Sequence, residues 1–500
     1  MGTTVIDLLV IGGGINGVGI ARDAAGRGLS VTLVEQGDLA SATSSWSSKL
    51  IHGGLGYLEQ YEFRLVREAL QEREVLLRLA PHIIRPLMFV LPYDASMRPM
   101  WMIRAGLWLY DHLGGTITLP RSKALTFPHM EFSAGLRPDI RAGFVYSDCR
   151  VDDSRLTVLN AVSARGKGAT ILTRTRFEGA RREEGAWSAT LAPRSGAPMQ
   201  VRARAIVNAA GPWVVDVLGH IEGERIRDRV RLVKGSHIIV PKVHSQGHAL
   251  ILQNPDKRVV FVIPYEHDFS LVGTTDVAVS RVEEAARITE EETAYLIAAA
   301  NRFLAKPLRA ADIVHSYAGV RPLYDDGSDN PSEVTRDYVL KVDHDGRTAP
   351  LLTVFGGKIT TYRRLAEEAL GHLAPFFPNL KAPWTATEEL PGGDVGHFNA
   401  YRDAMHARYP ELGRELVEGV VRRHGTRTPA ILGDARRPEA LGKGFGAGLT
   451  QREIEFLVAD EWAETAEDVL WRRTKCGLHM TSQQMDAVAD FMRQGTETSA

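Results

Sequence analysis

One short segment near the N-terminus constrains the fold of this chain more than any other. The apolar run at residues 6–11 leads into Gly12-x-Gly14-x-x-Gly17, and residues 15–25 then read as a helix of small side chains. In such a strand, turn and helix, the glycines permit the turn, admit a pyrophosphate close to the backbone, and let the helix pack on the strand. A purely structural glycine turn is the alternative. We interpret the segment as a dinucleotide site in a doubly wound, mainly parallel α/β sheet.

A carboxylate at the end of the next strand narrows the choice of dinucleotide. The apolar run Val31–Val34 follows a break at residues 26–28 and ends at Glu35, which lies 18 residues after Gly17. A carboxylate at this place accepts hydrogen bonds from ribose hydroxyl groups and argues against a ribose 2′-phosphate. These residues alone leave both NAD and FAD open.

The charge and cysteine counts exclude several other classes of protein. Sixty Lys and Arg residues against sixty-one Asp and Glu residues give a net charge of −1, so no overall field favours nucleic acid. The two cysteines, Cys149 and Cys476, are far apart, which argues against a disulfide framework, a zinc module or an iron–sulfur cluster, and we expect no metal. No apolar run reaches the roughly 18–20 residues that span a bilayer, so we expect a cytoplasmic protein that is not exported.

The order of predicted strands and helices divides the chain into three domains. Small-residue helices and short buried strands assign residues 1–85, 150–230 and 340–380 to a discontinuous dinucleotide-binding domain. Strand-like segments between residues 230 and 275 place residues 86–149 and 231–339 in a β-sheet substrate domain. A charged, helical composition after the Pro-containing stretch 376–391 predicts a C-terminal helical domain at residues 385–500.

Seven further motifs carry a resemblance to a known family. They lie at residues 41–58, 208–213, 234–237, 273–276, 319–323, 335–338 and 355–363. Together with the glycine-rich turn, and in order along nearly the whole chain, they resemble the aerobic FAD-dependent glycerol-3-phosphate dehydrogenases of bacteria. The resemblance implies FAD, in a Rossmann-like domain of the glutathione-reductase/D-amino-acid-oxidase type, and sn-glycerol 3-phosphate as substrate. It also implies a membrane quinone as electron acceptor, a homodimer, and peripheral association with the inner face of the cell membrane.

The resemblance and the glycine-rich turn together predict which residues contact the cofactor. We expect these to be Gly12, Gly14, Asn16, Gly17, Glu35, Thr43, Ser44, Ser45, Ser48, Lys49, Gly53, Gly54, Ala210, Gly211, Trp213, Gly357, Lys358 and Thr360. A helix that begins after Gly357, capped by Thr360 and Thr361, can present backbone N–H groups to the negative charge of a reduced flavin. The alternative is a helix that is merely capped against the sheet.

Oxidation of an alcohol by a flavin needs a base for the hydroxyl proton. Histidine is best suited near neutral pH, and His52 and His237 both lie in glycine- or serine-flanked loops at predicted strand ends. Either can instead make only a local hydrogen bond, and the sequence does not decide which of the two acts.

A phosphate ester needs cations that hold its oxygens. Arg321, Arg336 and Lys358 are the candidates, and Arg321 is also expected to take part in catalysis. Tyr57 and Thr274 complete the expected substrate-binding set. The alternative for each arginine is a solvated surface ion pair.

One position departs from the family pattern. The family usually carries arginine in a Gly-Gly-x-Arg-Tyr-Leu run, where this chain has Gly56 before Tyr57. If that arginine binds the substrate phosphate, its absence weakens substrate binding or leaves the phosphate to be bound by the remaining cations. Trp46 stands where a smaller residue is usual, and we interpret it as packing over the cofactor.

Two apolar stretches are candidates for contact with lipid. Residues 100–110 are rich in aromatic side chains, and residues 362–377 are amphipathic. The alternative for each is burial in the core. Because the net charge is near zero, hydrophobic insertion rather than electrostatic attraction would dominate the contact.

Three other functions stay open. A glycerol-3-phosphate oxidase would keep the fold and substrate but pass electrons to oxygen, forming hydrogen peroxide. An amine or amino-acid oxidase of the same fold would carry a carboxylate clamp in place of the three cations. A non-catalytic FAD-binding sensor would use its C-terminal helices for interaction.

Overall fold

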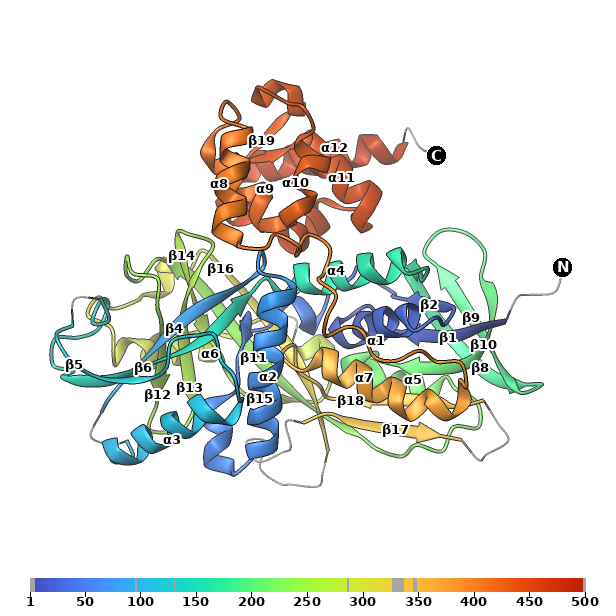
Figure 1. The fold of residues 1–500 in the computed structure, drawn as a ribbon, viewed down its shortest axis with the longest axis horizontal. Coiled ribbons are helices and arrows are strands. Elements are labelled where there is room, and N and C mark those ends of the chain that lie inside the picture. Colours follow the sequence, from blue (N-terminus) through green and yellow to red (C-terminus); the bar gives the residue numbers. More distant parts are fainter. Residues whose placement is uncertain are drawn as a thin grey trace.

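Two large sheets and a separate group of helices make up the chain (Figure 1). The computed structural model describes residues 5–94, 97–129, 131–285, 287–325, 337–344 and 349–497. Arg336, one of the three expected phosphate ligands, lies outside the described residues.

The first sheet contains the glycine-rich turn. Its central strands run parallel in the order β18, β10, β1, β2 and β7, while β17 and the β8–β9 hairpin join antiparallel. The strands are β1 (Val5–Ile11), β2 (Val31–Val34), β7 (Thr170–Leu172), β8 (Thr175–Glu183), β9 (Ala186–Pro193), β10 (Met199–Asn208), β17 (Val339–Asp343) and β18 (Leu351–Phe355).

Both faces of this sheet are covered, so its central strands are apolar throughout. Leu8 and Val10 of β1 pack with the helices α1 (Ile15–Gly26), α4 (Asp153–Gly166) and α7 (Tyr362–Leu373). The alternate residues Leu9 and Ile11 pack on the opposite face, under the β8–β9 hairpin and the short helix α5 (Val214–Gly219).

The second sheet is mainly antiparallel and follows the order β15, β11, β14, β13, β12, β4, β6 and β3, with β16 paired to β11 and β5 paired to β6. Its strands are β3 (Leu50–Ile51), β4 (Ile84–Pro92), β5 (Lys123–Thr126), β6 (Ala142–Val151), β11 (Val230–Pro241), β12 (Ala249–Gln253), β13 (Val259–Tyr265), β14 (Phe269–Gly273), β15 (Val277–Val279) and β16 (His315–Tyr324). Helix α6 (Glu290–Asn301) covers one face, and α2 (Phe63–Leu79) and α3 (Met100–Leu113) pack on the other.

The C-terminal part of the chain is helical. It contains α8 (Phe398–Arg408), α9 (Arg414–His424), α10 (Thr428–Leu432), α11 (Gln451–Glu461), α12 (Ser482–Glu497), a turn of π-helix η9 (Asp468–Arg473) and the small strands β19 (Gly444–Gly446) and β20 (Leu449–Thr450). Figure 1 shows it as a separate body beside α4 and the ends of β14 and β16.

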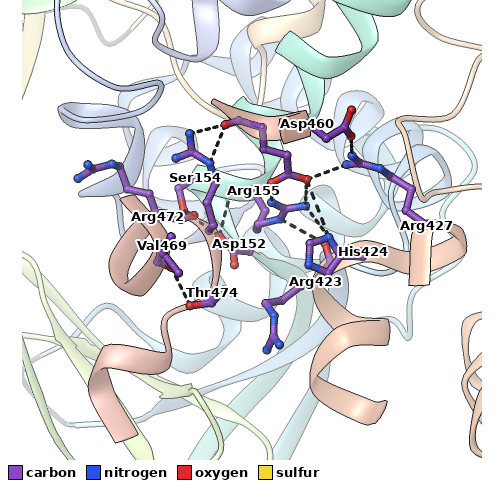
Figure 2. Close-up of polar contacts among 12 residues, drawn as sticks. Asp152, Ser154, Arg155, Arg423, His424, Arg427, Asp460, Val469, Arg472 and Thr474 are labelled. Atoms are coloured by element: carbon purple, nitrogen blue, oxygen red, sulfur yellow. Dashed lines mark hydrogen bonds and ion pairs between the residues drawn. The ribbon is translucent and has the colours of Figure 1, made fainter. Parts of the chain in front are cut away.

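Charged groups buried at the junction join this C-terminal body to the rest. The guanidinium of Arg155, on α4, pairs with Glu461 of α11 and donates to the backbone carbonyl of Arg423 over 3.2 Å, and none of the Arg155 and Glu461 side chains is exposed (Figure 2). Arg473 donates two hydrogen bonds of 2.7 and 2.8 Å to Asp38, which follows β2. The C-terminal body is therefore anchored next to the loop that carries Glu35.

The predicted arrangement is confirmed: a doubly wound α/β domain, a β-sheet domain and a C-terminal helical domain. The exact domain boundaries stay a prediction. Thr289 forms the capping box expected at the start of α6. Among the helices in the described ranges, none is long and apolar enough to cross a membrane.

One of the two predicted lipid-contacting stretches is wrong. The apolar side of α7, including Leu365, Leu370 and Leu373, is fully buried against α1 and the first sheet. Its amphipathic pattern therefore reflects core packing and leaves no apolar face for lipid. The other stretch, α3, does expose aromatic side chains.

Candidate active site

The glycine-rich turn joins β1 to α1 with the geometry of a phosphate cradle. A Cβ added at Gly17 would lie 1.9 Å from the carbonyl oxygen of Gly12, so only glycine lets the helix approach the strand this closely. Gly14 caps α1 without any side-chain hydrogen bond. The hydroxyl of Ser44 accepts a 2.9 Å hydrogen bond from the amide of Ile15, which brings the loop at residues 41–49 to the helix N-terminus.

Glu35 and Asn16 flank this turn. The Glu35 carboxylate accepts hydrogen bonds from the amides of Gly13 and Gly37 over 2.6 and 2.7 Å. Burial raises the pKa of Glu35, although these amide bonds oppose the rise. Asn16 donates to the carbonyl of Gly356 over 3.1 Å, and among the described residues its buried Oδ1 has no hydrogen-bond partner. Glu35 and Asn16 thus offer acceptor oxygens beside the turn, which suit the hydroxyl groups of a ribose or another polyol.

The loop at residues 41–49 ties the first sheet to the second. Thr43 donates to the carbonyl of Val320 over 2.6 Å, and the Ser48 hydroxyl lies 2.9 Å from His237 Nε2. The ammonium of Lys49 binds Asp153 and the carbonyl of Ser45 over 2.8–3.0 Å. The side chain of Lys49 therefore holds the loop in place. Only the backbone of Lys49 is left to contact the predicted cofactor.

A row of residues in register crosses four neighbouring strands of the second sheet. Phe261, Gly273, His237 and Tyr317 lie directly opposite one another on β13, β14, β11 and β16. Directly opposed residues of antiparallel strands project from the same face. His52 continues the row, edge-on to Phe261 with ring centroids 6.4 Å apart. The two candidate histidines thus face one site from either side of Gly273.

His237 has the surroundings of a base. Its ring stacks on Tyr317 with centroids 4.9 Å apart and leans over Gly273, where a Cβ would lie 2.9 Å from Nε2. Burial, and then the charges of Arg321 and Lys49, hold the pKa of His237 well below its usual value of 6.5. The imidazole is therefore neutral at pH 7 and available to accept a proton.

His52 has different neighbours from those of His237. Its backbone amide donates to Thr360 Oγ1 over 3.3 Å. Burial lowers its pKa, Asp148 opposes that change, and the charge of Lys358 adds to it. His52 thus lies beside the start of α7 and the Lys358 side chain.

The two expected cations within the described residues come from separate parts of the chain. Arg321 of β16 pairs with Asp276 and donates to Thr274 Oγ1 over 3.0 Å, with 28% of its side chain exposed. It is therefore half-buried in a cluster rather than solvated at the surface. The ammonium of Lys358 lies 3.9 Å from the ring centre of Tyr57.

The predicted caps of α7 are only partly correct. Thr361 is the N-cap residue, but its side chain makes no capping hydrogen bond, and Thr360 binds the amide of His52 instead. The amides at the start of α7 are thus not satisfied by these hydroxyl groups. The remaining predicted cofactor residues follow strand ends: Gly53, Gly54, Ala210, Gly211, Trp213 and Gly357.

The sequence reasoning missed several residues that shape the site. Asp276 lies in the motif at residues 273–276, but the sequence predicts no role for it. In the structure its carboxylate pairs with Arg321. Phe261, Tyr317 and Asp153 carried no local signal, because only strand register and the fold of α4 bring them to the site. Trp46 packs against Gly319 of β16.

Comparison with known proteins identifies the family. A family model described as FAD dependent oxidoreductase matches residues 7–363. The chain belongs to this FAD-dependent oxidoreductase family. A second model, described as the C-terminal domain of alpha-glycerophosphate oxidase, matches residues 384–499. The chain is thus a flavin-dependent enzyme with FAD as its cofactor.

Individual relatives of this flavoenzyme match over nearly its whole length. It is 53% identical to a glycerol-3-phosphate dehydrogenase of Pseudomonas aeruginosa, over 98% of this chain and 95% of that protein. It is 52% identical to a D-erythritol 1-phosphate dehydrogenase of Brucella abortus, over 97% of each. The X-ray structure of the glycerol-3-phosphate dehydrogenase from Bacillus halodurans complexed with FAD has a TM-score of 0.78 at 27% identity, covering 98% of this chain and 91% of that one.

The residues present fit FAD. The close approach of Gly17 to Gly12 clears space for a pyrophosphate, the buried Asn16 Oδ1 lacks a partner among the described residues, and the Glu35 carboxylate faces the same turn.

Proposed function

We propose that this flavoenzyme oxidises sn-glycerol 3-phosphate to dihydroxyacetone phosphate. The observation that carries the proposal is the cluster of Arg321, Thr274 and His237 on one face of the second sheet, together with the contact of Lys358 with Tyr57. An arginine–lysine pair suits a phosphate dianion, and a neutral histidine suits a hydroxyl proton. The names of the relatives support the same substrate class.

In this mechanism the protein holds the ester and moves one proton. Arg321 and Lys358 bind the phosphate oxygens, and Thr274 keeps the guanidinium in place. His237 accepts the proton of the hydroxyl group that becomes the ketone at Nδ1, the ring nitrogen that has no hydrogen-bond partner among the described residues, while Nε2 stays hydrogen-bonded to Ser48. FAD supplies the acceptor for the hydride that leaves the same carbon. Ser48 and Tyr317 hold the imidazole ring in position.

The proposal is tested by the flavin absorbance of the purified holoenzyme under anaerobic conditions, before and after addition of sn-glycerol 3-phosphate. Rapid bleaching supports it. A bound flavin that bleaches only with an amino acid would instead indicate an amino-acid or amine oxidase, and one that no substrate reduces would indicate a sensor. Peroxide formed in stoichiometric amounts in air would favour oxygen over quinone as acceptor.

Gly56 favours a second candidate substrate, a longer polyol phosphate such as erythritol 1-phosphate. A Cβ added at Gly56 would meet no atom within 4 Å, so the position where family members carry arginine is open space next to Tyr57. Because Gly56 is exposed, this space is open to solvent, and a longer polyol phosphate that reached it would meet no side chain of residue 56. The relative named for erythritol 1-phosphate supports this alternative.

Substitution of Gly56 by arginine is expected to lower KM for sn-glycerol 3-phosphate about tenfold, because one charge-assisted hydrogen bond to the phosphate is added. Steady-state kinetics with both substrates measures the effect, and the KM for erythritol 1-phosphate should rise. Gly166→Arg, at another glycine with no neighbour within 4 Å of a Cβ, is the control. An unchanged or raised KM for glycerol 3-phosphate in Gly56→Arg would contradict this role.

We further propose that the enzyme works as a peripheral homodimer on the inner face of the cell membrane, with quinone as acceptor. Helix α3 supports the membrane contact, since the Trp101 and Trp108 side chains are 70% and 56% exposed. Tyr61 and Phe63, at the start of α2, are 80% and 40% exposed. Arg98 pairs with Glu59 over 3.3 Å, which holds the two segments together. Such an exposed aromatic set suits a bilayer interface.

The double substitution Trp101→Ser, Trp108→Ser is expected to weaken binding to phospholipid vesicles at least tenfold, because two large aromatic side chains no longer insert. Vesicle sedimentation measures it, and flavin reduction in detergent should be unchanged. Val458→Ser, at a 47% exposed apolar residue of α11, is the control. Vesicle binding equal to that of the unchanged protein would show that α3 does not contact lipid.

A further inference from the structure

A cavity of about 450 Å³ lies between the second sheet and the C-terminal helices, apart from the candidate active site. Its walls come from β4, β6, the turn between β13 and β14, helix α9 and the segment after η9. This volume lies in the range of about 300–1,000 Å³ typical of small-molecule sites. Figure 2 shows Asp152, Arg423 and Thr474 at this junction.

Two arginines meet on one wall of the cavity, and neither forms an ion pair with a described carboxylate. Arg85 of β4 and Arg150 of β6 are directly opposed in the antiparallel ladder, so their side chains share a face. Cβ atoms of such a pair are about 4.5–5.5 Å apart, and like charges there are destabilising. Within the described part of the chain, no carboxylate oxygen lies within 4.0 Å of either guanidinium. Burial lowers the pKa of Arg150, as expected for a desolvated cation.

Two of the carboxylates that line the cavity pair with cations that also line it. Asp152 binds Lys475 over 2.6 Å, and Glu418 binds Arg422 over 2.5 Å. Burial raises the pKa of Glu266, which favours its neutral form. Asp268 and Glu415 lie at exposed positions. Among the described residues, Glu266 is therefore the carboxylate whose charge acts on Arg150, and it does so without forming an ion pair.

Other polar groups complete the wall. His82 is fully buried, and neither ring nitrogen has a hydrogen-bond partner among the described residues. Arg85 donates to the carbonyl of His82 over 2.9 Å and lies over the ring of Phe398, on α8. Arg422 of α9 faces the pair from the C-terminal side. Three guanidinium groups, two from the second sheet and one from the C-terminal helices, thus line the cavity.

We infer that this cavity is a second binding site, for a phosphate monoester, formed by Arg85, Arg150 and Arg422. An anion between the two strands removes the repulsion of the opposed arginines and satisfies guanidinium groups that otherwise lack a carboxylate. The volume exceeds that of a phosphate ion, and the remaining carbon chain would lie toward Glu266 and Thr474. The inference does not depend on which substrate the flavin site oxidises.

Calorimetric titration of the FAD-loaded enzyme with inorganic phosphate and with glycerol 2-phosphate tests the inference. We expect the double variant Arg85→Met, Arg150→Met to bind one ligand fewer per chain than the unchanged enzyme. The KM for flavin reduction by its substrate should not change, because neither arginine lies at the flavin site. Arg121→Met, at an exposed arginine, is the control and should keep the full stoichiometry.

Thermal unfolding separates a binding role from a purely structural one. In phosphate-free buffer Arg150→Met should raise Tm, because it removes the like-charge contact, and it should lose about 2 °C of the stabilisation by phosphate that the unchanged enzyme shows. A lowered Tm of Arg150→Met, together with an unchanged number of phosphate ions bound per chain, would contradict the proposed site. Loss of one bound inorganic phosphate without at least tenfold tighter binding of glycerol 2-phosphate would overturn the assignment of an ester and leave the free anion as ligand.

Discussion

Replacement of His237 by glutamine is expected to slow flavin reduction about 10²–10⁴-fold, the usual contribution of a positioned general base. Glutamine keeps a hydrogen-bonding group near Ser48 and roughly the size of the ring, but it cannot accept the hydroxyl proton. Anaerobic stopped-flow absorbance at saturating substrate measures the rate. Flavin content and Tm show whether the variant is folded and loaded.

His52→Gln is the matched control, because His52 lies on the same face on the other side of Gly273. It should slow reduction far less, since His52 lies beside Lys358 and Thr360 rather than Arg321. A larger loss in His52→Gln than in His237→Gln would transfer the role of base to His52.

The pH profile gives an independent check. Because burial and the charges of Arg321 and Lys49 hold the pKa of His237 well below 6.5, the ring stays neutral until the pH falls below that value. The rate of reduction should therefore be constant near neutral pH and decline only on the acid side of 6.5. The His237→Gln variant should lose this acid limb. An acid limb centred above pH 6.5 would contradict the assignment.

Glu461→Gln is expected to lower the free energy of unfolding by about 3–5 kcal/mol, the usual cost of breaking a buried ion pair by removing one partner. The Glu461 carboxylate is fully buried between Arg155 and Arg427, and its loss leaves the buried Arg155 guanidinium without a carboxylate (Figure 2). Urea denaturation followed by circular dichroism measures the change.

Asp460→Asn is the matched control for this variant, because the residue is adjacent on α11 and also binds arginines, but from a side chain that is 36% exposed. Exposed pairs contribute about 0–1 kcal/mol, so this variant should differ little from the unchanged enzyme. If Glu461→Gln and Asp460→Asn lowered the free energy of unfolding equally, burial of the ion pair at the junction would not determine its contribution to stability.

The dependence of stability on pH follows from the ion pair between Glu461 and Arg155. Burial raises the pKa of Glu461, but the charges of Arg155 and Arg427 outweigh it and lower the pKa below its usual 4.5. Its stabilising contribution is therefore complete above about pH 4.5 and is lost as the pH falls toward the folded-state pKa. The Glu461→Gln variant should lack this acid-induced loss. Glu453, with its pKa lowered to about 2, adds to the loss in both proteins.

The sequence by itself determined the parts of this protein that depend on local chemistry. The spacing of Gly12, Gly14 and Gly17 is diagnostic because no side chain fits where α1 meets β1. The distance of Glu35 from that turn predicts a ribose ligand, which stays a prediction; the structure shows that its carboxylate accepts hydrogen bonds from the amides of Gly13 and Gly37. The order of motifs was sufficient for the family, the cofactor and the three-part fold.

Only the tertiary structure decided how distant residues meet. An amphipathic pattern is the same whether its apolar side faces lipid or protein, so the sequence left both alternatives open for α3 and α7. The structure buries the apolar side of α7, while α3 exposes its tryptophans. The opposition of His237 to Gly273 and Tyr317, and of Arg85 to Arg150, depends on strand register. Register is set by pairing between strands that are far apart in the chain, and no local pattern records it.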